Sequence, residues 1–300
     1  MPPAPVPVSE ELRTFHHSLY PPERIAAARE RSVTVCLPAK ECADTVGTIV
    51  AALETLRRQG ALDEILVVDA ASGDGTAEIA ARAGATVLQE SELMTEYGPV
   101  FGKGDAMWRA LDACAGELVC FIDADTEGFS AHFATGLLGP LVCEPGVQLV
   151  KGFYRRPLGA CGERNGEGGG RVNHLTARPA LALFYEPLAA VRQPLAGEVA
   201  ATRELLEQLP FVTGYGVETG MLIDAWHAVG LRSMAQVDLD EHRNRHKPLA
   251  ELEPMAGTVL ATIAVRLAAE GRLRGAGEAL LERPPLASLA DRSALRVAGG

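Results

Sequence analysis

Leu118-Val-Cys-Phe-Ile-Asp-Ala-Asp125 is an apolar run that ends in two carboxylates separated by one residue. The run predicts a buried strand, and alternate residues of an extended backbone point to the same side. Asp123 and Asp125 can therefore face one ion, and buried carboxylates are costly unless they are paired or bind a cation. One or two carboxylates, completed by water and phosphate oxygens, suit Mg²⁺ or Mn²⁺. The alternative is a strand that ends in a solvated Asp turn.

Strand and helix patterns alternate through the first half of the chain. The expected strands cover residues 32–37, 64–69, 85–88 and 117–122, and the expected helices cover 44–58, a segment starting in the turn 71–76, and 105–114. This alternation predicts an α/β fold with a parallel sheet and right-handed crossovers. Such sheets bind ligands beyond the carboxyl ends of their strands. Pro38, Asp69 and Asp123 stand at those ends, so we expect them to cluster.

The second half has a less regular pattern. Strands are expected at residues 147–153 and 233–239, and helices at 171–183, 214–228 and 248–274. Residues 158–170 are rich in glycine and predict a mobile loop. The last ~25 residues are rich in Ala, Arg and Leu and predict a helical tail. The proline-rich residues 1–8 predict a disordered lead-in.

Composition argues against several classes of protein. The chain of 300 residues is 47% hydrophobic and has a formal net charge of −11, which argues against general nucleic-acid binding. It has no uninterrupted apolar window of ~18 residues and no signal-peptide pattern, so we expect neither a transmembrane helix nor export. The six cysteines include no Cys-x-x-Cys pair, which favours a reduced cytoplasmic enzyme over a disulfide scaffold or zinc site.

Three polar residues are candidates to join the Asp pair. Asp69 could accept from a nucleotide base or ribose, or stabilise the turn 70–75. Lys103 lies between two glycines before a helix, where it could meet a phosphate. His242 could complete a metal site opened by Asp125, although a lone His is more often structural or solvated.

A second candidate group is basic. It comprises Lys151, Arg155, Arg156, Arg171 and Arg243-Asn244 in a chain that is acidic overall. Gly168-Gly-Gly-Arg171 precedes a predicted helix, so backbone N–H groups and the guanidinium fork could bind phosphate or carboxylate. The group therefore indicates an anionic small molecule. The alternative is a flexible glycine loop with surface arginines.

Nine motifs occur together in an order typical of one enzyme family. They are Leu37-Pro-Ala39, Val68-Asp69, Gly102-Lys-Gly104, Asp123-Ala-Asp125, Val150-Lys-Gly-Phe-Tyr-Arg-Arg-Pro157, Gly168-Gly-Gly-Arg-Val172, Gln193-Pro-Leu-Ala-Gly-Glu198, Gly214-Tyr-Gly-Val-Glu218 and His242-Arg-Asn244. Over about residues 30–250 the chain resembles the glucosyl-3-phosphoglycerate synthases and their mannosyl-transferring relatives, retaining glycosyltransferases of family 81. The Tyr-Arg-Arg-Pro and Gly-Gly-Gly-Arg blocks are the specific part of the match.

The resemblance implies a GT-A (Rossmann-like) fold with a mixed, mostly parallel sheet and a C-terminal helical extension. The implied division is an N-terminal arm (1–30), a nucleotide-sugar-binding half (31–155), an acceptor-binding half (156–247) and the extension (248–300). Donor contacts are implied for Pro38, Ala39, Glu41, Asp69, Ala70, Lys103, Asp123 and Ala124. Acceptor contacts are implied for Gly170, Arg171, Asn173 and Asn244. Asp125 and His242 are implied metal ligands, and Asp125, Glu218 and the Leu195 carbonyl are implied catalytic groups.

Two departures from the family pattern fall near the expected nucleotide. The chain has Glu41-Cys42 where the family usually has Asn-Glu, and Ala70-Ala-Ser72 where Ser-Gly-Ser is common. A carboxylate at position 41 could accept from the N1–H and N2–H edge of guanine. We therefore expect guanosine donors, including GDP-mannose, to be accepted beside uridine donors. Asn173 stands where relatives often carry Thr.

The resemblance and the residues together predict a hexosyltransferase dependent on Mg²⁺ or Mn²⁺. It would move glucose or mannose from a UDP- or GDP-linked donor to the 2-hydroxyl of 3-phosphoglycerate, giving a compatible-solute or polysaccharide precursor. Its partners would be these two substrates, with no nucleic acid and no membrane, in a cytoplasmic homodimer. The alternatives are a GT-A transferase acting on polyprenyl phosphate and a non-catalytic nucleotide-sugar-binding protein.

Overall fold

The computed structural model describes residues 11–156, 170–242, 248–273 and 282–288. The strands within these ranges are β1 (Arg13–His16), β2 (Val33–Ala39), β3 (Glu64–Asp69), β4 (Thr86–Gln89), β5 (Leu118–Phe121), β6 (Leu149–Arg155), β7 (Val199–Thr202), β8 (Phe211–Val212), β9 (Met234–Glu241) and β10 (Glu282–Arg283). One eight-stranded sheet has the order β1-β9-β6-β7-β5-β2-β3-β4, and β8 pairs with β10. The large sheet is mixed, because β7 is antiparallel to β5 and β6 and its other pairs are parallel.

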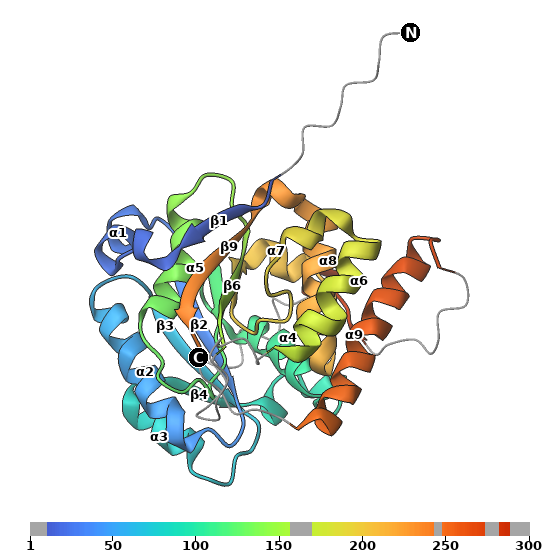
Figure 1. Ribbon diagram of the computed structural model, residues 1–300. Helices are drawn as coiled ribbons and strands as arrows, with labels where there is room; N and C mark the ends of the chain where they lie inside the picture. Colours follow the sequence, from blue (N-terminus) through green and yellow to red (C-terminus); the bar gives the residue numbers. More distant parts are fainter. Residues whose placement is uncertain (1–10, 157–169, 243–247, 274–281, 289–300) are drawn as a thin grey trace, which may run out of the picture.

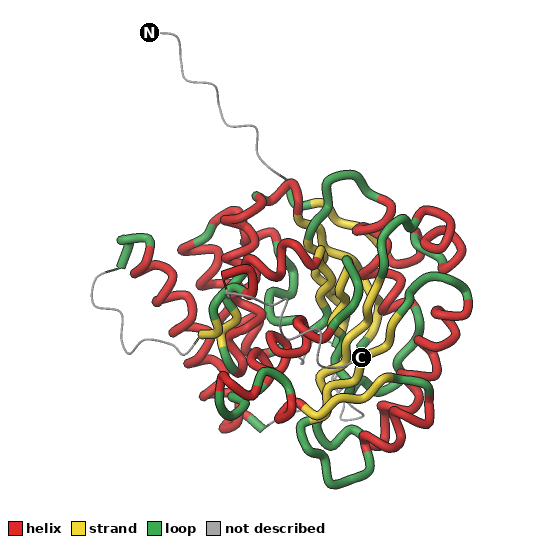
Figure 2. Tube along the Cα trace, turned by 180° about the vertical axis from the view of Figure 1, so that it is seen from behind, coloured by secondary structure: helices red, strands yellow, loops and turns green. Residues whose placement is uncertain are grey.

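Helices cover both faces of this sheet (Figures 1 and 2). They are α1 (Pro22–Ala28), α2 (Ala43–Arg58), α3 (Thr76–Ala83), α4 (Lys103–Ala113), α5 (His132–Cys143), α6 (Arg178–Phe184), α7 (Arg203–Gln208), α8 (Val217–Val229) and α9 (Leu249–Ala269). One apolar layer contains Ile25, Leu53 and Leu137, from α1, α2 and α5. The opposite layer contains Trp108 and Ile263, from α4 and α9. The result is a three-layer α/β domain.

The central strands explain where the site forms. β2 and β3 are buried on both faces, which accounts for their nearly continuous apolar sequences. Their register pairs Ala39 with Asp69, and β5 lies on the other side of β2 with Phe121 opposite Cys36. The carboxyl ends of the three strands therefore meet at one edge, and the predicted clustering there is confirmed.

Several elements lie where the sequence predicted none, among them β7, β1 and α5. β7 reads only Val-Ala-Ala-Thr, and its strand character comes from its place between β5 and β6. β1 lies in the segment predicted as an N-terminal arm and pairs with β9, with Phe15 opposite Val237. α5 contains two glycines and Pro140, which are weak helix formers, and burial of its apolar side chains stabilises it instead.

The long helix α9 has the length and the apolar composition of a membrane span. Three of its apolar residues, Val259, Ile263 and Leu267, are buried in the domain. On the same helix Arg266 forms a salt bridge with Asp224 of α8, with 2.6 Å between nitrogen and oxygen. The helix is thus held against α8 by apolar and charged contacts.

The sequence predicted a helical C-terminal tail, and this prediction is wrong for the described residues 282–283. Residues 282–283 form β10 against β8. Arg283 donates to the buried Asp105 carboxylate over 2.8 Å, and the indole N–H of Trp108 donates to the carbonyl of Pro284 over 2.8 Å. This docking on α4 depends on contacts between residues far apart in the chain, which local patterns do not reveal.

Candidate active site

A cavity of about 620 Å³ opens at the carboxyl ends of β2, β3 and β5. Its lining contains many of the residues predicted for the site: Pro38, Ala39, Ala70, Lys103, Asp123, Ala124, Asp125, Arg171, Leu195 and Glu218. They come from strand ends, from α4 and α8, and from the segment before β7. The structure therefore gathers residues from across the chain into one space.

Lys103 is a half-buried cation in the lining of this cavity. Its Nζ lies 2.6 Å from Oδ1 of Asp123 and 3.0 Å from Oε1 of Glu218. Burial disfavours the charged amine, but the two carboxylates outweigh that effect and hold the pKa of Lys103 well above its ordinary value. The amine is consequently an ammonium at neutral pH, placed at the first residue of α4.

Gly197 lets Asp123 occupy its position. A Cβ at residue 197 would stand 2.3 Å from Oδ2 of Asp123, closer than real Cβ contacts allow. Because Gly197 stands just before β7, the antiparallel strand brings its backbone onto the Asp pair. The glycine of the motif ending in Glu198 is therefore required by close approach.

Asp125 stands beside Asp123 at the mouth of the cavity. Asp125 is exposed to solvent, but desolvation by the surrounding protein still raises the pKa of its carboxyl, and the neighbouring Asp123 charge raises it further. Lys103 and His242 act in the opposite direction, so Asp123, Lys103 and His242 all lie within electrostatic reach of Asp125. A carboxylate destabilised in this way gains from a bound cation.

His242 lies within electrostatic reach of Asp125 and has several contacts of its own. Its backbone N–H donates to the carbonyl of Arg155 over 2.9 Å, and its ring stacks on Tyr154 with 4.4 Å between ring centroids. Its Nε2 lies 3.0 Å from Thr126 Oγ1 and 3.0 Å from Glu198 Oε1. The imidazole therefore has one ring nitrogen fixed by polar partners.

Glu198 is a buried anion beside this imidazole. Burial would raise the pKa of its carboxyl, but His242, Tyr154 and Arg156 together hold that pKa well below the ordinary value. The Tyr154 hydroxyl donates to Oε2 of Glu198 over 2.7 Å, and Arg156 donates to the Tyr154 oxygen over 2.8 Å. The charge thus belongs to a connected polar network.

Asp125 and His242 fit a divalent cation. Nδ1 of His242 is buried and has no hydrogen-bond partner in the described part of the chain. Thr126 Oγ1 donates to the carbonyl of Asp123, so it accepts from Nε2 of His242, and a proton on Nε2 leaves the free lone pair on Nδ1. The Glu198 carboxylate lies on the same side of the ring, 3.0 Å from Nε2. Metal-bound imidazoles commonly have this carboxylate on the opposite ring nitrogen. The orphaned nitrogen and the destabilised carboxylate are the groups that a metal ion would satisfy.

The residues predicted for the acceptor lie in different settings. Arg171 and Leu195 line the cavity, whereas Gly170 and Asn173 are not part of its lining. The Oδ1 of Asn173 accepts from the backbone N–H of Leu195 over 3.4 Å, so this side chain supports the cavity wall. Asn244 lies outside the described residues.

Two residues that were predicted to contact the donor nucleotide stabilise a turn and are not part of the cavity lining. Glu41 has a left-handed backbone (φ 51°), and its Oε1 accepts from the N–H of Gly73 over 2.8 Å. Asp69 is buried, and its Oδ2 accepts from the N–H of Ser72 over 3.1 Å. The alternative role predicted for Asp69, stabilisation of the turn 70–75, is therefore observed. Direct donor contacts from these two carboxylates stay a prediction.

Relatives of known name share this architecture. A family profile described as glycosyl transferase family 2 matches residues 34–133. A glucosyl-3-phosphoglycerate synthase of Mycolicibacterium smegmatis is 42% identical over 282 residues, covering 89% of this chain and 93% of that protein. The chain belongs to the glucosyl-3-phosphoglycerate synthase family.

Solved structures of this family support the same conclusion. Mannosyl-3-phosphoglycerate synthase from Rubrobacter xylanophilus is 45% identical, with a TM-score of 0.86 over 92% of this chain and 96% of that one. Glucosyl-3-phosphoglycerate synthase from Mycobacterium tuberculosis, in complex with Mn²⁺, UDP-glucose and phosphoglyceric acid, is 38% identical, with a TM-score of 0.81 over 92% and 98% of the chains. The GT-A fold predicted from the motifs is confirmed.

The cavity also contains residues to which sequence reasoning assigned no role. Tyr215 and Glu90 line it, and so do Leu252 and Met255 of α9. Tyr215 stands inside a quoted family motif, so a signal for it existed. The α9 residues lie in an ordinary helical pattern, and only the packing of that helix brings them to the site.

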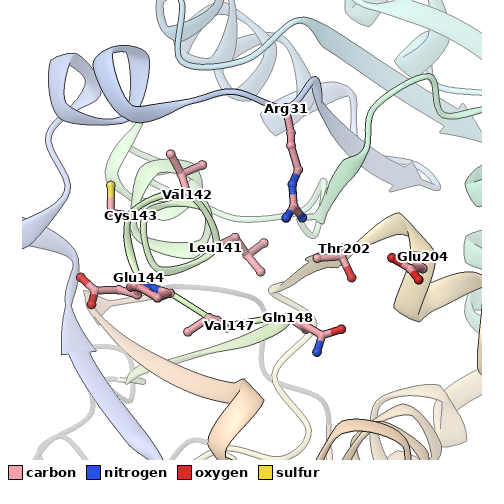
Figure 3. Close-up of a pocket in the computed structure, with 11 residues that line it drawn as sticks. Arg31, Leu141, Val142, Cys143, Glu144, Val147, Gln148, Thr202 and Glu204 are labelled. Atoms are coloured by element: carbon pink, nitrogen blue, oxygen red, sulfur yellow. The ribbon is translucent and has the colours of Figure 1, made fainter.

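A second cavity, of about 440 Å³, lies at the opposite edge of the sheet (Figure 3). Arg31 precedes β2, Gln148 precedes β6, and Thr202 ends the antiparallel β7, so the lining marks the amino ends of the parallel strands. This position is far from the Asp pair in the fold, and parallel sheets bind their ligands at the other edge.

Proposed function

We propose that the protein is a metal-dependent retaining hexosyltransferase, which moves glucose or mannose from a nucleotide diphosphate sugar to the 2-hydroxyl of 3-phosphoglycerate. The observation that carries the proposal is that three functional side chains line one cavity. They are the half-buried ammonium of Lys103, the carboxylate of Asp125, which lies within electrostatic reach of His242, and the guanidinium of Arg171. The family membership supplies the reaction class.

Lys103 and the strand ends would bind the donor. Lys103 begins α4, where backbone N–H groups and the helix dipole favour an anion such as a diphosphate. Pro38, Ala39 and Ala70 form the adjoining wall, where the nucleoside would lie. A Mg²⁺ or Mn²⁺ ion held by Asp125 and His242 would neutralise charge on the leaving diphosphate.

Two guanidinium groups would bind the acceptor. 3-Phosphoglycerate carries one carboxylate and one phosphate, and Arg171 and Arg156 line the same cavity. Guanidinium groups bind both anions through paired N–H donors. The fixed backbone at Leu195 would then place its carbonyl near the acceptor hydroxyl.

The chemistry follows from this placement. The acceptor oxygen forms a bond to the anomeric carbon as the bond from that carbon to the diphosphate oxygen breaks. The departing phosphate oxygen takes the hydroxyl proton, so attack and departure occur on the same face and the configuration is retained. Glu218, 3.0 Å from Lys103, would stabilise positive charge developing at the sugar.

The preference of the enzyme for a uridine or a guanosine donor can be tested directly. One oxygen of Glu41 already accepts from Gly73, so a guanine contact would use the other oxygen. We expect turnover with both UDP- and GDP-linked sugars, because Ala70 removes a hydroxyl from this wall and specific hydrogen bonds are what produce strong discrimination. The kcat/KM values for the four combinations of UDP or GDP with glucose or mannose measure this. Turnover confined to uridine donors would contradict the role of Glu41.

The reaction itself is tested by release of nucleoside diphosphate in the presence of 3-phosphoglycerate and Mn²⁺. Asp125→Ala should lower kcat at least ~10³-fold, the loss expected when a principal electrostatic stabiliser is removed. Exposed Glu204→Ala is the control and should keep full activity. Wild-type turnover in the Asp125 variant would show that this residue has no role in catalysis.

We further propose that the enzyme acts in the cytoplasm as a homodimer. The described cysteines (Cys36, Cys42, Cys114, Cys120 and Cys143) are free thiols, four of them buried, which suits a reducing compartment. Light scattering coupled to size-exclusion chromatography measures the mass, and a monomeric mass at assay concentration would contradict the dimer.

A further inference from the structure

A second group of possible metal ligands lies on the far side of β9 from the cavity. His16 ends β1, His17 begins the turn that follows, and Asp240 lies near the end of β9. One ligand atom from each of the three residues lies within 4.8 Å of the other two. β1 runs beside β9 in the sheet (Figure 1), so the group joins the N-terminal strand to the strand that leads to His242.

The Asp240 carboxylate presents one oxygen to each imidazole. Its Oδ2 lies 2.6 Å from Nε2 of His17, and its Oδ1 lies 3.4 Å from Nε2 of His16. Asp240 has a left-handed backbone (φ 65°), which is sparsely populated outside glycine, and its N–H donates to Asp238 Oδ1 over 3.0 Å. A strained backbone thus holds the carboxylate between the two rings.

Neighbouring groups restrain both rings. Nδ1 of His16 accepts from the backbone N–H of Ser18 over 3.2 Å and lies 2.8 Å from Ser18 Oγ. Because Nδ1 is an acceptor, the neutral ring carries its proton on Nε2, and a bound metal ion would displace that proton. The His17 ring lies against His132 with 4.2 Å between centroids, and its side chain is 16% exposed.

We propose that His16, His17 and Asp240 bind a divalent transition-metal ion of the Zn²⁺ type, through both Nε2 atoms and the carboxylate, with water in the remaining position. Two imidazoles and one carboxylate are a common donor set for such ions. Bonds of ~2.0–2.2 Å in a tetrahedron place ligand atoms ~3.3 Å apart, and one ligand atom from each of the three residues already lies within 4.8 Å of the other two. Small ring rotations would therefore complete the site, and the displaced Nε2 protons would leave to solvent.

Co²⁺ is the probe for this site, because its visible absorption reports imidazole coordination. The full-length chain carrying Asp125→Asn removes the proposed catalytic ligand while leaving the second group intact. We expect this chain to bind one Co²⁺ in a four-coordinate spectrum, and the added change His17→Gln to abolish that spectrum. The readout needs no activity, so failure of the proposed function would not affect it.

His227 provides a matched control. Its Nε2 lies 3.0 Å from Glu270 Oε1 in a pair that has the same chemistry with a single imidazole. In the same background, His227→Gln should leave Co²⁺ binding unchanged. An equal loss from His227→Gln and His17→Gln, or binding that survives His17→Gln, would show adventitious coordination and overturn the proposal.

A second measurement guards against misfolding of the His17 variant. The His16 side chain is 45% exposed, so His16→Gln should fold normally. Zn²⁺ should raise the Tm of the wild type and raise that of His16→Gln distinctly less, with both chains retaining the same transferase activity after chelation and reloading with Mn²⁺. An identical Zn²⁺ shift in the two chains would contradict the assignment.

Discussion

Glu198 shows how one residue can act on a metal through another. Its carboxylate is fully buried and lies 3.0 Å from Nε2 of His242, on the ring nitrogen opposite the orphaned Nδ1. An ionised partner there fixes the tautomer and increases the electron density of the ligand nitrogen. Glu198 touches neither substrate nor metal in this arrangement, so we regard it as a positioning residue.

Glu198→Gln should weaken Mn²⁺ binding ~10–100-fold, the usual effect of losing such an outer partner. The amide keeps the shape and the contact with Tyr154 but removes the negative charge. Titration of Mn²⁺ by electron paramagnetic resonance measures the affinity without turnover, and the KM for 3-phosphoglycerate should change little. Unaltered Mn²⁺ affinity would make Glu198 merely structural.

Arg171 is expected to act on the acceptor alone. Arg171→Ala should weaken 3-phosphoglycerate binding by about 2 kcal/mol, roughly thirtyfold, because a charge-assisted contact with the anion is lost. Donor affinity should stay within twofold of wild type. Calorimetry with each ligand separates the two effects, and exposed Arg178→Ala is the control. A parallel fall in both affinities would mean that Arg171 supports the fold.

At the scale of elements, the antiparallel strand β7 shapes the site through its entry segment. Gly197 and Glu198 both precede the strand. Gly197 lies against Asp123, and the side chain of Glu198 lies beside His242. The same short segment therefore controls both the Asp pair and the imidazole. α9 acts as the opposite wall, contributing Leu252 and Met255.

Gly197→Ala should abolish most activity while the chain stays folded. The new Cβ, 2.3 Å from the Asp123 carboxylate, would displace that side chain and break its 2.6 Å contact with Lys103. Gly257→Ala in α9 is the matched control, because nothing lies within 4 Å of its Cβ position, and it should stabilise the helix by ~0.5–1 kcal/mol. Circular dichroism melts and turnover distinguish the two variants. Full activity of Gly197→Ala would show that Asp123 is not constrained.

At the scale of the whole molecule, stability should depend on pH through a buried lysine. Lys151 of β6 is 3% exposed, and its ammonium donates to the carbonyl of Ala196. Burial lowers the pKa of Lys151 from 10.5 to about 8, against the opposing effect of Glu218 and Glu198. The unfolded chain therefore holds this proton over a range in which the folded chain has released it, so stability from this group rises as pH increases from about 8 to 10.5.

Lys151→Met should remove that dependence. Relative to the variant, the free energy of unfolding of the wild type should increase by up to about 3 kcal/mol between pH 8 and 10.5. Urea denaturation at several pH values measures the difference, and exposed Lys40→Met should parallel the wild type. A constant difference across this range would mean that Lys151 keeps its ordinary pKa when folded.

The amino-acid sequence by itself determined the parallel half of the sheet, the Asp pair at its edge and the family. Those features depend on local alternation of apolar residues and on short motifs. Both signals can be recognised within a few consecutive residues. Only the tertiary structure decided that β7 runs antiparallel beside β5, that β1 joins the far edge, and that α9 lines the cavity. It also decided that Glu41 and Asn173 turn to backbone partners. These outcomes depend on contacts between residues distant in sequence, where packing outweighs local propensity.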